Sequence, residues 1–195
     1  MASKDKSPQL AIGFRVKTGR ATAIVMAGPA STPRVLSRRS LQLWDPVIPE
    51  SHQPFHAELE LPPAESARVV PQALKAVERV ALSALRELVD EIQPALGSIL
   101  GIALVAVRIV FAAESACGKS SANRFGGPRG RARACEVPAL TLVESEVFTS
   151  AAAKLGKSPD AIKLAVTELG SAVGKPWSAE EKAAAAAAWI VLADR

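Results

Sequence analysis

The residues best suited to chemistry in this sequence are cations that could contact phosphate groups. Lys119, Arg124, Arg129 and Arg131 fall within residues 112–136, a Gly-rich stretch without hydrophobic periodicity. Basic side chains bind phosphate oxygens, and a phenylalanine in the same stretch could stack on a base. The same composition is typical of a solvated loop that has no ligand, so both interpretations stay open.

Part of this stretch resembles a phosphate-binding P-loop in its residue types. Gly118, Lys119 and Ser120 fit that motif and follow a predicted strand, but Ala113 stands where the motif needs glycine. The residues that come next are rich in Gly and Arg instead of forming a helical pattern. These differences favour a basic loop that contains Gly-Lys-Ser by chance.

The histidines and cysteines give weak signals for a metal site. His52 and His56 have the four-residue spacing of metal ligands on a helix, but Pro54 between them favours a surface loop. Cys117 and Cys135 are too few for a four-ligand zinc site, and one pair is no disulfide framework. We therefore expect the reducing environment of the cytoplasm.

Length and composition indicate the size and the type of core of the domain that positions these residues. The chain has 195 residues, of which 49% are hydrophobic and only 4% aromatic, so we expect one domain with an aliphatic core. Residues 1–9 are polar and predict a tail, and residues 10–195 predict a single domain. The net charge of +5 permits contact with nucleic acid or anionic lipid.

The first half of the sequence predicts three strands and a long helix. Strands are expected at Leu10–Lys17, Arg20–Met26 and Arg34–Trp44, with Gly19 in the first hairpin turn. Five prolines in residues 45–63 predict a loop or extended arm. A helix should then begin near Ala64 or Pro71 and end at Gln93, because apolar residues recur at spacings of three and four: Leu74, Val77, Ala81, Leu85, Leu88 and Ile92.

The very apolar run after this helix has two interpretations. Ala95–Ala113 just reaches the length of a membrane span, but Arg108 lies inside it. The Ile and Val content favours a strand over Ile99–Phe111 that is buried on both faces. We therefore expect no membrane association.

Three helices are predicted to close the chain. Thr141–Glu144 fits a capping box that would start a helix ending at Leu155, after a short strand over residues 137–140. Ser158 and Pro159 fit the start of a second helix that ends at Gly170. Ser178–Glu181 is another capping box, and it opens an Ala-rich helix through Leu192; packing roles are expected for Trp177 and Trp189.

This order of elements resembles the ribonuclease H-like superfamily: an α/β mixed sheet with a three-strand meander, a long helix, a central strand and C-terminal helices. Residues 16–23 resemble the first phosphate-binding hairpin of sugar kinases and actin-like ATPases in that superfamily. The resemblance implies phosphate contacts by Lys17, Thr18 and Arg20. Residues 163–189 resemble the end of bacterial Holliday-junction resolvases.

The resemblance also implies where catalytic acids would stand. Nucleases of this type gather three or four carboxylates around Mg²⁺ or Mn²⁺. Glu114 and Glu181 are the candidate catalytic residues, with Glu78 or Glu87 as a further acid from the long helix. The first-strand aspartate is replaced by Val16 or Lys17, and the second acid of the last helix by Ala184.

The sequence therefore favours a degenerate ribonuclease H-like protein that binds nucleic acid or acts in an assembly. No cofactor is expected for that function. The first alternative is a metal-dependent nuclease using Mg²⁺ or Mn²⁺, and the second is a phosphate-ligand or nucleotide-binding domain. The oligomeric state is left open, with a homodimer among the alternatives.

Overall fold

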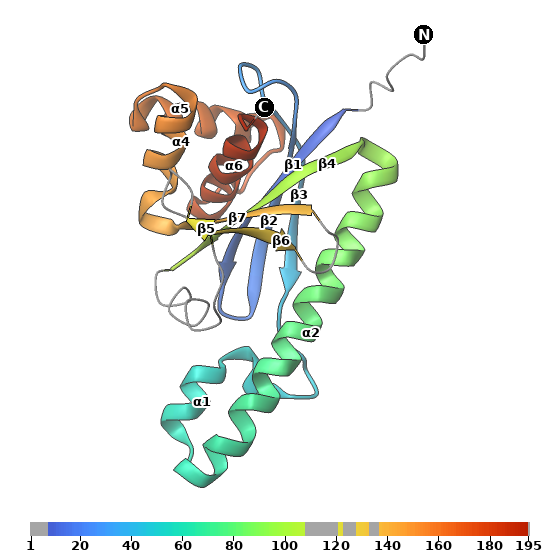
Figure 1. The fold of residues 1–195 in the computed structure, drawn as a ribbon, viewed down its shortest axis with the longest axis vertical. Coiled ribbons are helices and arrows are strands. Elements are labelled where there is room, and N and C mark those ends of the chain that lie inside the picture. Colours follow the sequence, from blue (N-terminus) through green and yellow to red (C-terminus); the bar gives the residue numbers. More distant parts are fainter. Residues whose placement is uncertain (1–7, 108–120, 123–127, 133–136, 195) are drawn as a thin grey trace.

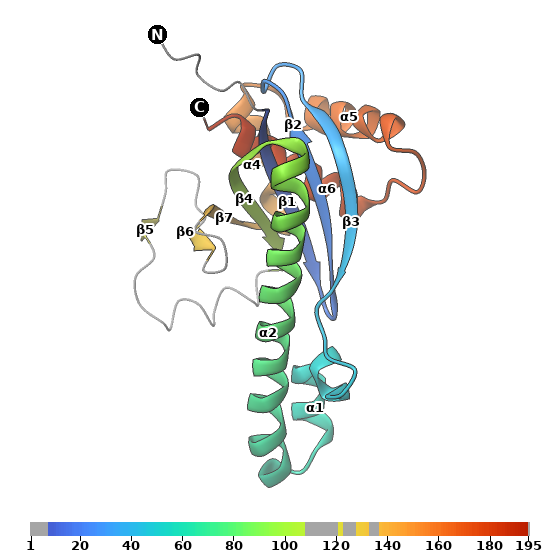
Figure 2. The ribbon, with the colours of Figure 1, turned by 90° about the vertical axis from the view of Figure 1, so that its right-hand side faces the viewer.

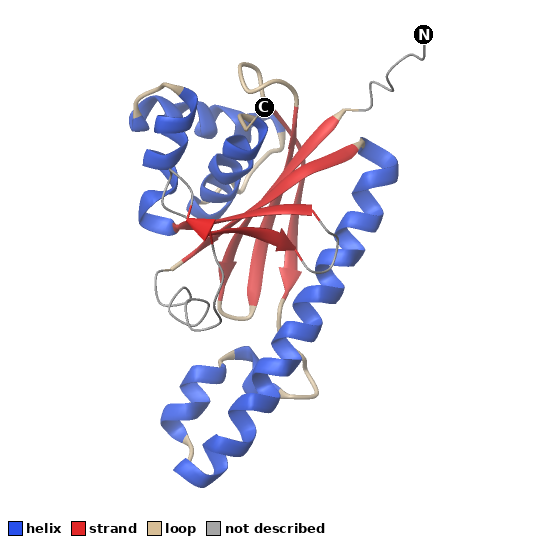
Figure 3. Ribbon diagram, in the orientation of Figure 1, coloured by secondary structure: helices blue, strands red, loops and turns tan. Residues whose placement is uncertain are grey.

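The protein has a mixed α/β fold built on an open sheet. The computed structural model describes residues 8–107, 121–122, 128–132 and 137–194. Helices cover both faces of the sheet, which gives three layers (Figures 1 and 3). The strands are β1 (Gln9–Lys17), β2 (Arg20–Ala27), β3 (Arg34–Gln42), β4 (Ser98–Ala106), β5 (Ser121–Ala122), β6 (Pro128–Ala132) and β7 (Val137–Val143).

The strand order in the sheet is β3-β2-β1-β4-β7-β6-β5. The first three strands form the predicted antiparallel meander, and β4 and β7 both run parallel to β1. Gly19 makes the turn between β1 and β2 with a φ of 73°, a conformation that favours glycine. The carboxyl ends of β1, β4 and β7 therefore meet at one edge of the sheet.

One face of the sheet is covered by α6 (Ala179–Leu192), which contacts β1, β2 and β4. Ser178 and Glu181 form the predicted capping box at the start of this helix. The helix can lie very close to the sheet because Ala183–Ala188, all buried, carry the smallest side chain with a β-carbon. Gly13 of β1 has no β-carbon at all, and one placed there would overlap the backbone of Ala184.

Two more helices and two tryptophans support this face. Helix α4 (Val147–Leu155) ends at Gly156, and α5 (Pro159–Leu169) has Ser158 as its N-cap, as predicted. The Nε1 of Trp189 donates to the carbonyl of Ala30 at 2.8 Å, and that of Trp177 to the carbonyl of Val166 at 2.9 Å. Both tryptophans therefore have the packing roles expected for them.

The opposite face is covered by the last turns of α2 (Pro63–Leu96), a helix of 34 residues. Leu88 and Ile92 pack there against apolar side chains of β1, β2 and β4. The first half of α2 extends beyond the sheet and carries α1 (Pro54–Glu60) and a 3-10 turn, Pro49–His52, as a projecting arm (Figure 2). Ala73 and Ala76 are buried in this half.

The prediction of a loop or extended arm without helix over residues 45–63 was wrong, and the long helix runs three residues past its predicted end at Gln93. Pro49 and Pro54 begin short helical segments, because proline needs no backbone donor in a first turn. Helix α2 starts at Pro63, continues through Pro71 and Pro94, and ends only before Gly97.

Two predictions in the second half of the chain also need correction. Thr141 does not begin a helix: it lies in β7 opposite Leu104 of β4, and α4 begins at Val147. Sheet pairing thus prevails over a local capping pattern. Within residues 112–136, predicted as a loop, the structure has the short strands β5 and β6.

The apolar run after α2 forms β4, which ends at Ala106, and the predicted end at Phe111 lies outside the described residues. Among the residues that the structure describes, no helix is long and apolar enough to cross a membrane.

Candidate functional site: a cationic hollow at the turn between β1 and β2

The end of β1 places positive charge on the face of the sheet that α6 covers. Side chains alternate along a strand, so Gly13, Arg15 and Lys17 share one face, while Phe14 and Val16 pack on the α2 side. Of the two positions that the resemblance gave for an acid, only Lys17 therefore faces α6. Both residues that follow Gly13 on this face are cations.

Arg15 is a buried cation that the sequence analysis did not single out. Its side chain is 3% exposed, and its Nε donates to Oε1 of Glu144 at 2.9 Å while Nη2 lies 2.5 Å from Oε2. This two-point geometry is the preferred one between a guanidinium and a carboxylate. Glu144 directly follows β7, so the pair joins two strand ends that are 129 residues apart in sequence.

Glu180, in the first turn of α6, is held by three groups from the β1–β2 hairpin. Its Oε1 lies 2.5 Å from Nζ of Lys17 and 2.9 Å from Nη2 of Arg20. Its Oε2 accepts a hydrogen bond from the hydroxyl of Thr22 at 3.3 Å. The hydrogen bond from Lys17, with a smaller contribution from Arg20, lowers the pKa of Glu180 although partial burial opposes this.

Glu181, one of the predicted catalytic acids, has a structural contact. Its Oε2 accepts from the backbone N–H of Ser178 at 2.7 Å, which completes the capping box. Its Oε1 lies 3.9 Å from Nη1 of Arg38. Ala184, where the resolvase pattern has its second acid, is fully buried beneath β1.

A hollow of about 800 Å³ opens at this end of the hairpin. Every charged residue on its lining is a cation: Arg15, Lys17 and Arg20. Hydroxyl, amide and aromatic groups make up much of the remaining wall, namely Thr18, Ser40, Gln42, Trp44 and His52. The predicted phosphate-contacting residues Lys17, Thr18 and Arg20 therefore all line one hollow.

The aromatic wall of the hollow depends on Gly19. The rings of Trp44 and His52 are 5.2 Å apart in an edge-to-face arrangement. A β-carbon at Gly19 would lie 2.7 Å from Cδ2 of His52, so glycine allows the imidazole to lie against the turn. His52 thus belongs to the hollow, whereas the sequence favoured a surface loop for it and left a binding loop as the alternative.

The other predicted site residues are not brought to this hollow. Glu114, Lys119 and Arg124 lie outside the described residues, as does the P-loop-like segment. The backbone of Arg129 and Arg131 lies in β6, which β4 and β7 separate from β1 in the sheet.

The remaining candidate acids, both on α2, also lie elsewhere. Glu87 faces the hollow between α2 and β3, and Glu78 lines another hollow formed by α2 alone.

The described acids do not fit a Mg²⁺ or Mn²⁺ site. Glu144, Glu180 and Glu181 each have a cationic partner, and Arg15 and Lys17 would repel a metal ion. No group of three or more His, Cys, Asp or Glu residues that could hold a metal is found within the described part of the chain. What this arrangement can do chemically is bind an anion.

Comparison with known protein families finds none that matches this chain, and comparison with curated protein sequences finds no relative.

Proposed function

We propose that this chain is a non-catalytic ribonuclease H-like protein that binds nucleic acid through the cationic hollow. The strand order supports the fold assignment, because an antiparallel meander β3-β2-β1 followed by the parallel strands β4 and β7 is the order that such proteins share. The connection from β4 to β7 contains β5 and β6.

The observation that carries the function is the chemistry of the hollow. Three cations line it, and no acidic side chain does so among the described residues. Cations bind the phosphates of a nucleic-acid backbone, and aromatic rings such as those of Trp44 and His52 stack on unpaired bases. The combination of cations and aromatic rings favours binding of a single strand, or of an unpaired end, over binding of an intact duplex.

The proposal that the protein is non-catalytic is supported by the same residues. Two-metal hydrolysis needs carboxylates free to share divalent ions, and here the nearest carboxylates are bound by Arg15, Lys17 and Arg38. Cleavage of single-stranded or junction DNA that requires Mn²⁺ would favour the metal-dependent nuclease instead.

The first test is a titration of fluorescein-labelled DNA followed by fluorescence anisotropy, at several salt concentrations. Single-stranded, duplex and four-way-junction DNA should be compared. If Lys17 and Arg20 contact phosphates, affinity for a single strand should fall about seven-fold between 50 and 200 mM salt, and for a duplex about 12-fold. No binding of any form at low salt would contradict the proposal.

Glu180 should weaken nucleic-acid binding in the wild-type protein. Its carboxylate bonds to Lys17 and Arg20 as a phosphate would, so the two anions compete for the same cations. Glu180→Gln keeps the size of the side chain and removes its charge. We expect this variant to bind single-stranded DNA about three- to ten-fold more tightly.

Glu168→Gln is the matched control, since Glu168 is exposed on α5 and the change in charge is the same. Equal gains in both variants would show a general charge effect and contradict the competition.

A measurement of stability against pH shows what Glu180 contributes to folding, apart from its effect on binding. Because the pKa of Glu180 is lowered in the folded state, its stabilising contribution, below about 1 kcal/mol, is present at neutral pH. It is lost as the pH falls through that lowered pKa.

A second candidate function is the binding of a free nucleotide at the same hollow. Its volume of about 800 Å³ is favourable, since small-molecule sites usually fall between about 300 and 1,000 Å³. Isothermal titration calorimetry with adenosine and guanosine nucleotides distinguishes the two functions. A nucleotide that binds more tightly than an oligonucleotide would favour this second candidate.

A further inference from the structure

The open edge of the sheet forms a groove with helix α2. Strand β3 is the last strand on its side of the sheet. Between β3 and α2 lies a hollow of about 680 Å³, and a second of about 430 Å³ adjoins it toward the end of α2. The two share Arg39 and Glu91, so they form one groove along β3 from Leu36 to Gln42, which we call the edge groove.

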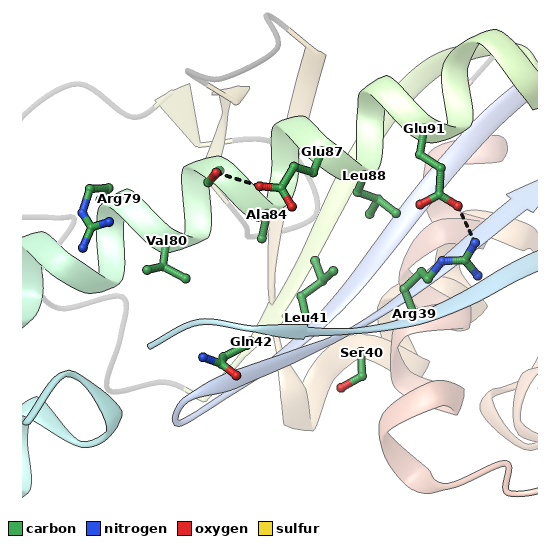
Figure 4. Close-up of a pocket in the computed structure, with 11 residues that line it drawn as sticks. Arg39, Ser40, Leu41, Gln42, Arg79, Val80, Ala84, Glu87, Leu88 and Glu91 are labelled. Atoms are coloured by element: carbon green, nitrogen blue, oxygen red, sulfur yellow. Dashed lines mark hydrogen bonds and ion pairs between the residues drawn. The ribbon is translucent and has the colours of Figure 1, made fainter. Parts of the chain in front are cut away.

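The floor of the edge groove is apolar and its rims are charged. Leu41 of β3 points toward Ala84 and Leu88 of α2 (Figure 4). Arg39 and Glu91 form an ion pair of 2.5 Å across the junction of the two hollows. Both side chains are about half exposed, and such surface pairs contribute only about 0–1 kcal/mol, so an incoming ligand can displace this one.

The strand edge determines what class of molecule fits. An edge strand presents backbone N–H and C=O groups that another extended chain can pair with. A polypeptide that adds to β3 as a further strand would place every second side chain over the apolar floor. The seven residues from Leu36 to Gln42 allow a bound strand of about 20 Å.

Charge argues against a second copy of this chain and for a peptide that contains a cation. Strand β3 carries Arg34, Arg38 and Arg39, and antiparallel pairing of β3 with itself over its full length would place Arg38 opposite Arg38 of the second copy. On the α2 side, the carboxylate of Glu87 accepts a hydrogen bond from the hydroxyl of Ser83 at 2.8 Å. No cation bonds to Glu87 in the described part of the chain, so a ligand cation can meet it there.

We propose that the edge groove binds an extended segment of another protein by strand addition to β3. The segment has apolar residues at alternate positions and a lysine or arginine that reaches Glu87. This proposal does not rest on the proposed binding to nucleic acid, since it uses the outer edge of β3 and the flank of α2, although Ser40, Leu41 and Gln42 line both the edge groove and the cationic hollow.

The test uses a fluorescein-labelled peptide as long as β3 that alternates valine with threonine and has one central lysine. A second peptide has prolines at the threonine positions and therefore lacks strand-forming N–H groups. Anisotropy should show that wild-type protein binds the first peptide and not the second. Absence of binding to the first peptide, or equal binding of both, would overturn the proposal.

Two variants and a matched control locate the binding. Ala84 is partly exposed, so Ala84→Arg should fill the groove without unfolding the protein and weaken binding at least about ten-fold. Glu87→Lys should weaken it about five-fold through charge reversal. Glu78→Lys, on the same helix but outside the groove, should leave binding unchanged.

Unchanged affinity in both groove variants would place the peptide elsewhere and refute the site. Sedimentation of the unliganded protein tests whether a second copy of the chain fills the groove instead of a peptide. A wild-type dimer that Ala84→Arg dissociates would show that a second copy fills the groove, and the proposal would then be wrong.

Discussion

Gly13→Ala is expected to destabilise the protein by at least about 3 kcal/mol, because α6 lies directly against this glycine. A β-carbon at position 13 would overlap the carbonyl oxygen of Ala184 and lie 2.8 Å from the amide nitrogen of Ala188. Both neighbours are backbone atoms of one helix, so no side-chain rotation relieves the overlap. The whole helix must move away from the sheet, and its buried alanine face would lose contact with β1, β2 and β4.

Urea denaturation followed by circular dichroism measures this loss. Gly156→Ala is the control, since Gly156 has nothing within 4 Å of the new β-carbon but has a φ of 64°. That variant should lose about 1 kcal/mol from backbone strain alone. A Gly13→Ala protein no less stable than Gly156→Ala would show that α6 does not pack this closely.

Ala184→Asp is expected to unfold the protein and not to restore a catalytic acid. The resemblance to resolvases places an aspartate at this position, but the methyl group of Ala184 is fully buried under β1. A carboxylate there would lose its hydration in a buried apolar cluster, which costs several kcal/mol.

Ala179→Asp tests whether burial is the cause. Ala179 is exposed in the first turn of the same helix, where a negative charge interacts favourably with the helix dipole. Thermal denaturation should give that variant a melting temperature equal to or slightly above that of the wild type. An Ala184→Asp protein that folds normally and cleaves DNA with Mn²⁺ would overturn both the packing and the proposed loss of catalysis.

The elements that the sequence predicted well are those specified by local signals. The turn at Gly19 and the caps at Ser158 and Ser178 depend on residues within four positions of one another, and the structure has all three. Local signals gave the wrong secondary structure where contacts with residues far away in the sequence determine it. Thr141 pairs with β4 in the sheet, and the proline-rich segment forms short helices that pack on α2.

In the candidate site too, the sequence identified residues that are neighbours in the chain but missed partners that are far apart in it. Lys17, Thr18 and Arg20 were singled out from one hairpin, and the structure places them on the lining of one hollow. Their role in binding phosphate stays a prediction. The partners Glu144 and Glu180 were missed because 129 and 160 residues separate them from Arg15 and Arg20. A charged residue within an apolar strand, as at Arg15, is the signal that could have indicated a buried ion pair.

The measurement that tests the central claim most directly compares the affinity for single-stranded DNA of wild-type protein and of the double variant Lys17→Gln/Arg20→Gln at low salt. Lys75→Gln/Arg86→Gln is the control, because it removes the same charge from exposed positions on α2. We expect the hollow variant to lose at least about ten-fold in affinity and the control to lose no more than about two-fold. Equal losses in the two variants would mean that nucleic acid binds through overall charge, and the cationic hollow would not be its site.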